Sequence, residues 1–299
     1  MKLLRFRIRD AAVANRVPQD VIEKDYVLSY IVAGVANTPS LANSLVFKGG
    51  TALKKCVFGE YRFSEDLDFT AVDAPKGPEL EAALQTALDW AAKELGQYGP
   101  FEFELERYEE KQPHPGGQEA FVVRVQFPWQ REPLCRVKVE ISFDEPVLTT
   151  IHRRKMAHGY DEPLEAEVDC YSLEEIVAEK LRALLQAHQK LVMRGWTQRR
   201  ARDYYDLWRI LKQYANDLDH QKLLPLLRKK CEVRGVDFKA IEDFFTKELV
   251  TEAERSWDTM LATFVPDLAP FDVVQSELRE MLERMLVSAG SDNPQARSV

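Results

Sequence analysis

The chain lacks the features that mark secreted, membrane-spanning and zinc-binding proteins. Its four cysteines are Cys56, Cys135, Cys170 and Cys231. They stand too far apart for a CxxC redox motif or a zinc knuckle, so we expect reduced and mostly buried thiols. The five histidines form no HExxH cluster, which argues against a zinc hydrolase. No apolar run approaches the roughly 20 residues of a membrane helix, and charges interrupt residues 1–10, where a signal peptide needs an apolar core. We therefore expect a cytoplasmic protein without a membrane segment.

Positive charge is also in short supply. The 41 Lys and Arg residues stand against 49 Asp and Glu, which leaves a net charge of −8. This balance excludes a general cationic coat for nucleic acid, although it permits local basic patches. The hydrophobic fraction of 45% and the charged fraction of 30% are ordinary for a globular protein. A length of 299 residues suits one large domain or two smaller ones.

The sequence pattern changes from mixed to almost purely helical near residue 171. Before that point, apolar spacing predicts helices at 17–35, 51–57 and 79–95 and strands at 45–47, 66–69, 101–108, 120–127 and 134–143. Pro and Gly at 114–117 predict a hairpin loop. After it, helices are expected from the N-cap Ser172 onward and at 199–214, 221–234, 238–248, 252–264 and 273–286. We predict an α+β fold, with an α/β domain at 1–170, a helical bundle at 171–287 and a disordered tail at 288–299.

The segment at 47–69, FKGGTALKKCVFGEYRFSEDLDF, contains the strongest sign of chemistry. Asp66 and Asp68 are two residues apart in a predicted strand, so both carboxylates leave the same face. A divalent cation relieves their repulsion, and oxygen ligands of this kind suit Mg²⁺. Glu140 lies on the polar face of the strand at 134–143, and it becomes a third metal ligand if that strand lies beside the first. A DxD pair alone is more often a solvated strand face.

A diglycine turn precedes these acids. Gly49 and Gly50 end one strand and begin a helix, so the backbone can approach a ligand closely and direct free N–H groups at phosphate. Further candidates for the same nucleotide site are the hydroxyls and cations of Thr51, Ser64, Lys48 and Arg62. A phosphate cradle beside a metal predicts a nucleoside triphosphate (NTP) site and phosphoryl or nucleotidyl transfer. A lone diglycine is usually only a turn, so the prediction depends on the combination.

These two motifs together resemble the nucleotidyltransferase β superfamily and, more narrowly, the AbiEii/AbiGii toxin family of bacterial abortive-infection and toxin–antitoxin modules. The family pattern is a GG-[ST] turn followed by R-x-S-x-D-[LI]-D-F, and residues 49–51 and 62–69 match it. Thr51 stands where many members carry serine. The resemblance implies a nucleotidyltransferase-type mixed sheet followed by a helical bundle. It also implies that Asp66 and Asp68 bind Mg²⁺ and that Ser64 and the turn hold the triphosphate.

Two charged residues interrupt apolar helix faces in the second half of the chain. Lys180 occupies a slot in an otherwise apolar stripe, and Asp203 lies on the inward face of the next helix with Asp206 beside it. A buried lysine is costly unless it is paired, so we expect a Lys180–Asp203 pair. A snorkelling lysine or a purely structural ion pair explains the same pattern. EEIVAEKLRALL and RARDYYDLWRI resemble later motifs of the family. That resemblance implies that Lys180 contacts nucleotide phosphates and that Asp203 assists catalysis or orients the lysine.

Cations gather locally despite the acidic total. One cluster lies at 152–155, and another surrounds Trp196 and comprises Lys190, Arg194, Arg199, Arg200 and Arg202. Positive charge beside an aromatic ring suits RNA phosphates and base stacking. A solvated loop between helices explains the second cluster equally well.

The resemblance also implies an activity and its partners. It points to an NTP-dependent nucleotidyltransferase toxin that modifies the 3′ end of tRNA, inhibits growth and is neutralised by a cognate antitoxin. Two alternatives stay open from the residues themselves. One is a nucleotide- or partner-binding module without transfer, and the other is nucleotidylation or phosphorylation of a protein acceptor.

Overall fold

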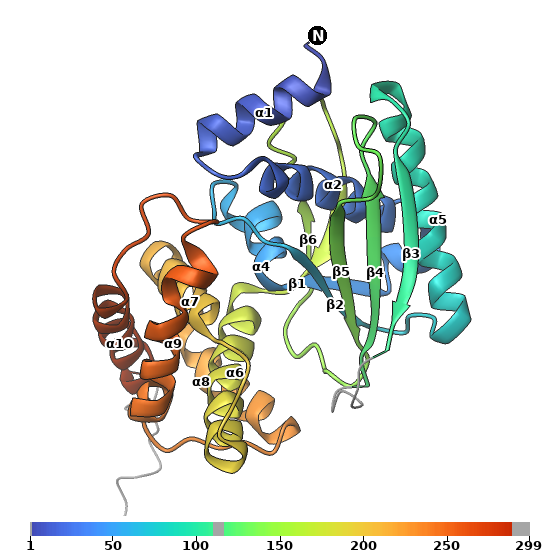
Figure 1. The fold of residues 1–299 in the computed structure, drawn as a ribbon. Helices are drawn as coiled ribbons and strands as arrows, with labels where there is room; N and C mark the ends of the chain where they lie inside the picture. Colours follow the sequence, from blue (N-terminus) through green and yellow to red (C-terminus); the bar gives the residue numbers. More distant parts are fainter. Residues whose placement is uncertain (1, 110–116, 289–299) are drawn as a thin grey trace, which may run out of the picture. The chain divides into compact units, whose positions relative to one another are not determined.

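The computed structural model describes residues 2–109 and 117–288 (Figure 1). The chain divides into two compact units. Unit 1 comprises Met1–Tyr171 and Phe264–Pro266, and unit 2 comprises Ser172–Thr263 and Asp267–Val299. The predicted loop at 114–117, except Gly117, and the predicted tail after Ser288 lie outside the described residues.

Unit 1 is built on a mixed sheet that has seven strands in the described part of the chain, in the order β3-β4-β5-β2-β1-β7-β6. The strands are β1 (Leu45–Lys48), β2 (Asp66–Ala71), β3 (Glu102–Tyr108), β4 (Glu119–Gln126), β5 (Cys135–Ser142), β6 (His152–Lys155) and β7 (Glu167–Cys170). Strand β2 runs antiparallel to β1 and parallel to β5. The two segments that flank the diglycine turn are therefore hydrogen-bonded neighbours in the middle of the sheet.

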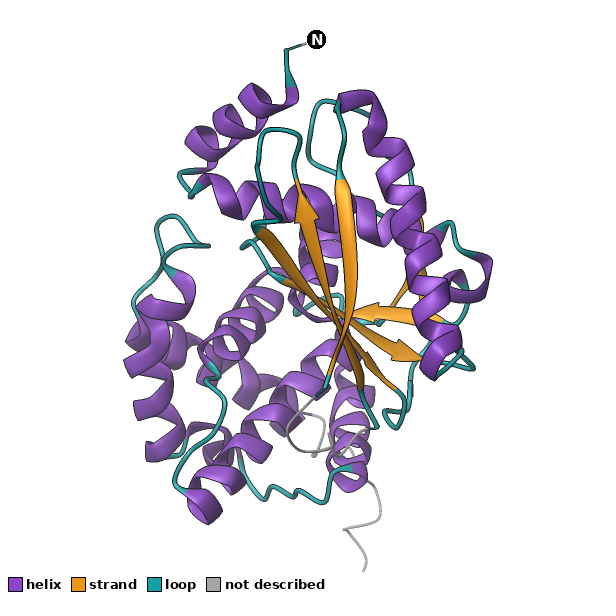
Figure 2. Cartoon of the chain, turned by 45° about the vertical axis from the view of Figure 1, so that its right-hand side comes forward, coloured by secondary structure: helices purple, strands orange, loops and turns teal. Residues whose placement is uncertain are grey.

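The helices of unit 1 bury one face of this sheet (Figure 2). They are α1 (Leu4–Asn15), α2 (Gln19–Ala36), α3 (Pro39–Ala42), α4 (Gly49–Ala52), the π-helical turn η1 (Leu53–Phe58), α5 (Gly77–Leu95) and the 3₁₀ turn η2 (Gly96–Tyr98). Leu67 and Phe69 of β2 are buried in the same core as Val139 of β5. Because side chains alternate along a strand, Asp66 and Asp68 leave the opposite face, where both are half-buried.

The described residues of unit 2 form helices joined by loops, with no strand among them. Its elements are α6 (Leu173–Arg194), α7 (Ala201–Tyr214), α8 (His220–Val233), the 3₁₀ turn η3 (Ile241–Phe245), α9 (Lys247–Leu261) and α10 (Phe271–Ser288). Ser172 caps α6 as predicted, because its Oγ accepts a hydrogen bond from the Glu175 N–H at 3.1 Å. None of the described helices combines the length and apolarity that crossing a membrane requires.

The α+β prediction is confirmed, one helix prediction is wrong and two short strands were not predicted. The helix expected at 238–248 is only the short turn η3, because Thr246 adopts an extended backbone and α9 starts afresh at Lys247. Strands β6 and β7 were not predicted. Each has four residues, and the one at the sheet edge, β6, consists only of histidine, arginine and lysine. Charged edge strands show no apolar alternation, although they protect a sheet edge from further pairing.

Candidate active site

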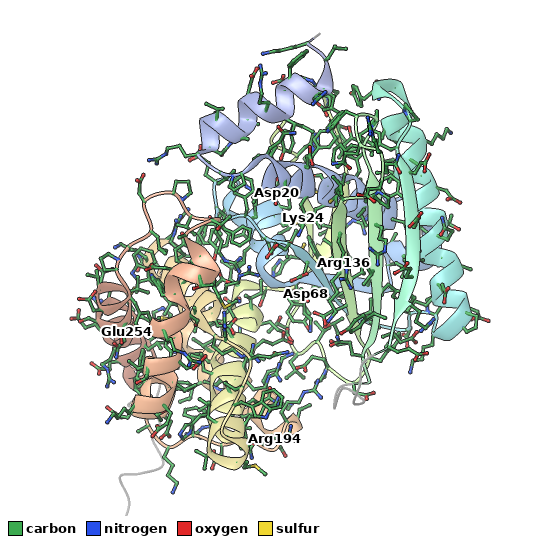
Figure 3. The ribbon with its side chains drawn as sticks, viewed as in Figure 1. Asp20, Lys24, Asp68, Arg136, Arg194 and Glu254 are labelled. Carbon is green, nitrogen blue, oxygen red and sulfur yellow. The ribbon has the colours of Figure 1, made fainter. Side chains whose placement is uncertain are left out.

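The diglycine turn and the strand acids form one site in unit 1. Strand β1 ends at Lys48, and the chain enters α4 at Gly49, whose φ of +77° lies in the left-handed region that favours glycine. A Cβ atom at Gly49 would lie 2.2 Å from Oδ2 of Asp68, the strand residue labelled in Figure 3. A side chain at Gly49 would therefore displace this carboxylate from the turn.

The second glycine makes room for two more predicted residues. A Cβ atom at Gly50 would lie 2.5 Å from Nη2 of Arg62 and 3.1 Å from Oγ of Ser64. Both side chains are buried, and Nη1 of Arg62 donates to the Phe63 carbonyl at 3.2 Å. The structure thus brings a guanidinium, a hydroxyl and a carboxylate against the two glycines of one turn.

Strand register places Asp68 in a row with two further charged residues across this face. Lys48 of β1 lies opposite Asp68 of β2, and Asp68 lies opposite Glu140 of β5. Asp66 lies opposite Lys138 in the same parallel pair. Directly opposed residues project from the same side of a sheet. Strand β5 therefore adjoins β2, which is the condition under which Glu140 was expected near the acids.

The carboxylate of Glu140 already has two partners. Nζ of Lys138 and Nε2 of Gln118 each donate to its Oε1 at 2.6 Å. Across the described residues, no three His, Cys, Asp or Glu side chains are arranged to hold a metal ion. Mg²⁺ usually takes one or two carboxylates and completes its octahedron with water and substrate phosphates. Asp66 and Asp68 fit that donor set, whereas Glu140 would have to exchange its present partners to become a ligand.

Thr51 does something other than expected. Its side chain is buried, and its Oγ1 donates to the backbone carbonyl of Asp66 at 2.6 Å. Thr51 was predicted as one of the hydroxyl donors at the triphosphate site, and in this structure its hydroxyl fastens α4 to the first residue of β2. Thr51 therefore holds the turn against the acid strand.

A second acid–lysine cluster lies in unit 2. Nζ of Lys180 lies 2.9 Å from Oδ1 of Asp203 and 2.7 Å from Oδ2 of Asp206. Arg200 also contacts Asp203, at 3.1 Å. Burial alone would raise the pKa of Asp203, but the charges of Lys180 and Arg200 hold that pKa below its usual value. The expected Lys180–Asp203 pair is present, and Asp206, expected only beside it, is the most buried member.

One buried pair near the turn escaped the sequence analysis. Lys55 of η1 lies 2.8 Å from the Asp25 carboxylate of α2, and both side chains are almost fully buried. The Tyr160 hydroxyl donates to the same carboxylate at 2.9 Å. Burial alone would raise the pKa of Asp25, but the charge of Lys55 lowers it. This pair ties the helical turn that follows Gly49 to the core helix α2. Its only sequence signal is a lysine inside an apolar helical segment.

A mixed sheet with a diglycine turn against an Asp-x-Asp strand is the arrangement that the sequence predicted for a nucleotidyltransferase. The model of the nucleotidyl transferase AbiEii toxin family, from type IV toxin–antitoxin systems, matches residues 31–284, and the chain belongs to this family. Its fold is similar to that of MenT4, a nucleotidyltransferase toxin from Mycobacterium tuberculosis, with a TM-score of 0.63 and 20% identity over 98% of this chain and 91% of that chain. A search of curated proteins finds no match.

These comparisons confirm the predicted family and enzyme class. The protein is a nucleotidyltransferase toxin of a toxin–antitoxin system, and the family implies an antitoxin as its partner.

Proposed function

We propose that this toxin acts in the cytoplasm, uses Mg²⁺ and transfers nucleotides from an NTP to the 3′ end of tRNA. Growth inhibition and abortive infection follow from loss of usable tRNA, and the cognate antitoxin relieves it. The observation that carries the proposal is the 2.2 Å between the Cβ position of Gly49 and Oδ2 of Asp68. It supports the proposal because it brings the diglycine turn and the acid strand together.

Each residue of the turn has a defined task in this proposal. Asp66 and Asp68 hold the metal, which when bound neutralises phosphate charge and orients the NTP for attack. Gly49 and Gly50 let the triphosphate approach the backbone. The Ser64 hydroxyl and the positive charges of Arg62 and Lys48 add contacts to the phosphates. Thr51 acts indirectly, because it keeps α4 in register with Asp66.

Lys180 and Asp203 keep the roles that the family resemblance implies for them. Lys180 contacts the nucleotide phosphates, and Asp203 orients it or assists catalysis. The contacts of Nζ with two carboxylates support the orienting role, because they fix the direction of the lysine side chain.

Label transfer tests the proposal directly. Purified protein is incubated with each labelled NTP and Mg²⁺, once with total RNA and once with cell lysate, beside the Asp66→Ala variant. We expect label on tRNA, loss of labelling in EDTA and recovery when Mg²⁺ is restored. Label on protein would favour protein nucleotidylation or phosphorylation instead. NTP binding without labelling of either polymer would mean a binding module and would overturn the proposal.

A further inference from the structure

The junction of α6 and α7 carries an exposed surface that combines apolar and basic side chains. We call it the basic corner and define it by Lys190, Arg194, Trp196 and Arg199. Helix α6 ends at Arg194, and Gly195, with a φ of +74°, turns the chain out of the helix just before Trp196. Trp196 is 64% exposed, and Val192 and Met193 beside it are 70% and 72% exposed. A large indole held this far out in water is a ready stacking platform.

Within residues 2–109 and 117–288, the cations of the basic corner have no carboxylate partners. No Asp or Glu occurs in the sequence from Lys180 to Arg202. Among the described residues, Lys190, Arg194 and Arg199 form no ion pair, whereas their neighbour Arg200 is paired with Asp203. Arg194, labelled in Figure 3, is exposed at the last turn of α6. The corner therefore keeps its positive charge in a protein whose net charge is −8.

These cations also lie close enough to repel one another. Partial burial, together with the positive charges of Arg200 and Arg194, lowers the pKa of Lys190. Like charges gathered without neighbouring acids destabilise the folded protein when no ligand is bound. An anionic ligand removes that repulsion.

The other basic cluster, at 152–155, includes cations that are paired with acids. In β6, Arg153 lies 3.2 Å from Asp169 and 4.0 Å from Glu167. Lys155 lies 4.0 Å from Glu165. These cations are already paired with carboxylates of β7 and of the segment just before it. From the sequence the two basic clusters were equivalent. The structure shows that they differ in their ion pairs with acids.

We propose that the basic corner binds the single-stranded end of the acceptor RNA, with Lys190, Arg194 and Arg199 on its phosphates and Trp196 stacked on an unpaired base. The choice of RNA rests on the proposed function. The chemistry is that of single-strand binding, in which cations track the backbone and an aromatic side chain stacks on a base of any identity. The exposed Val192 and Met193 flank the indole and extend the apolar contact to a base.

Binding to a fluorescent single-stranded oligoribonucleotide and to total tRNA tests this proposal. It is measured by anisotropy without NTP or Mg²⁺ at several salt concentrations. Changing Lys190, Arg194 and Arg199 together to Gln should reduce the slope of log affinity against log salt by about 2, since each phosphate contact on a single strand contributes about 0.7. Trp196→Ala should weaken binding roughly 5- to 100-fold and leave that slope unchanged. The matched control, Arg153→Gln with Lys155→Gln, should bind like the wild type.

Unchanged affinity and slope in the triple Gln variant would overturn the proposal. So would unchanged RNA binding combined with loss of antitoxin binding, because the corner would then be a protein interface. The result is separable from the proposed function. If RNA binding depends on the corner but no label reaches RNA, only the proposed function fails. If label reaches RNA as in the wild type when the corner is removed, only the assignment of the corner fails.

Discussion

Two sets of aspartates, one in each unit, show how differently the same side chain is used. Asp66 and Asp68 leave the polar face of a central strand and are half-buried beside a turn that glycine keeps open. Asp203 and Asp206 lie on a helix and share the ammonium group of Lys180. The strand pair lies against the diglycine turn, with Asp68 where a side chain at Gly49 would be, whereas the helix pair is arranged around a cation of the protein itself. We therefore expect substitutions in the first set to reduce activity with little effect on stability. Substitutions in the second set should reduce stability, in addition to any activity that depends on the orientation of Lys180.

Removing either strand acid should produce the largest effect. Asp66→Ala or Asp68→Ala should reduce nucleotide transfer at least about 1,000-fold, equivalent to about 4 kcal/mol of transition-state stabilisation. The free energy of unfolding should change by less than about 1 kcal/mol, because losing one of two neighbouring carboxylates relieves repulsion in the metal-free protein. Transfer of labelled NTP and urea unfolding measure the two quantities. Glu104→Ala, an exposed acid on β3 of the same sheet, is the control and should leave both unchanged. Unfolding of both Asp variants would remove the contrast between the two sets.

Closing the space at the turn should have the next largest effect. Gly49→Ala places a methyl group 2.2 Å from Oδ2 of Asp68 and forces alanine into a φ of +77°. We expect transfer to fall about 100-fold, with a destabilisation of about 1–2 kcal/mol from backbone strain.

Gly59 provides a matched control for that variant. Its φ is +70°, but nothing lies within 4 Å of its Cβ position. Gly59→Ala should therefore show a similar loss of stability in thermal unfolding and retain transfer activity. Equal activity losses in the two variants would mean that strain, and not displacement of Asp68, is responsible.

Breaking the helix cluster should mainly destabilise unit 2. Asp206 is 0% exposed and lies 2.7 Å from Lys180, so Asp206→Ala leaves the partly buried lysine with one carboxylate in place of two. Loss of one partner from a buried ion pair costs about 3–5 kcal/mol, and retained Asp203 favours the lower end. Arg255→Ala, which breaks the exposed pair with Glu252, is the control and should cost under about 1 kcal/mol. Chemical denaturation measures both, and equal costs would contradict the distinction.

The sequence predicted those features that depend on local periodicity. Alternation along 66–69 placed Asp66 and Asp68 on one face, and the interrupted helical stripes paired Lys180 with Asp203. Contacts between distant segments were not predictable in the same way. The partners of Glu140 include Gln118, which lies just before β4. Lys55 meets Asp25 across 30 positions. The sequence indicated that the Thr51 hydroxyl could contact a ligand, but it did not reveal that tertiary packing places this hydroxyl against the Asp66 carbonyl.

Acid titration should give the smallest effect and sharpen the comparison within the helix cluster. Lys180 and Arg200 lower the pKa of Asp203 against the opposing effect of burial, so its folded-state pKa lies below the unfolded value of about 3.9. The stabilisation is therefore fully present above the unfolded pKa and is lost as pH falls through the folded pKa. The difference in unfolding free energy between wild type and Asp203→Asn should be constant above about pH 5 and shrink below about pH 4. Urea unfolding from pH 3 to 7 measures it. A difference that stays constant to pH 3 in matched buffers would mean that the carboxylate of Asp203 gains nothing from Lys180 and Arg200, and the contrast between the two sets would then rest on Asp206 alone.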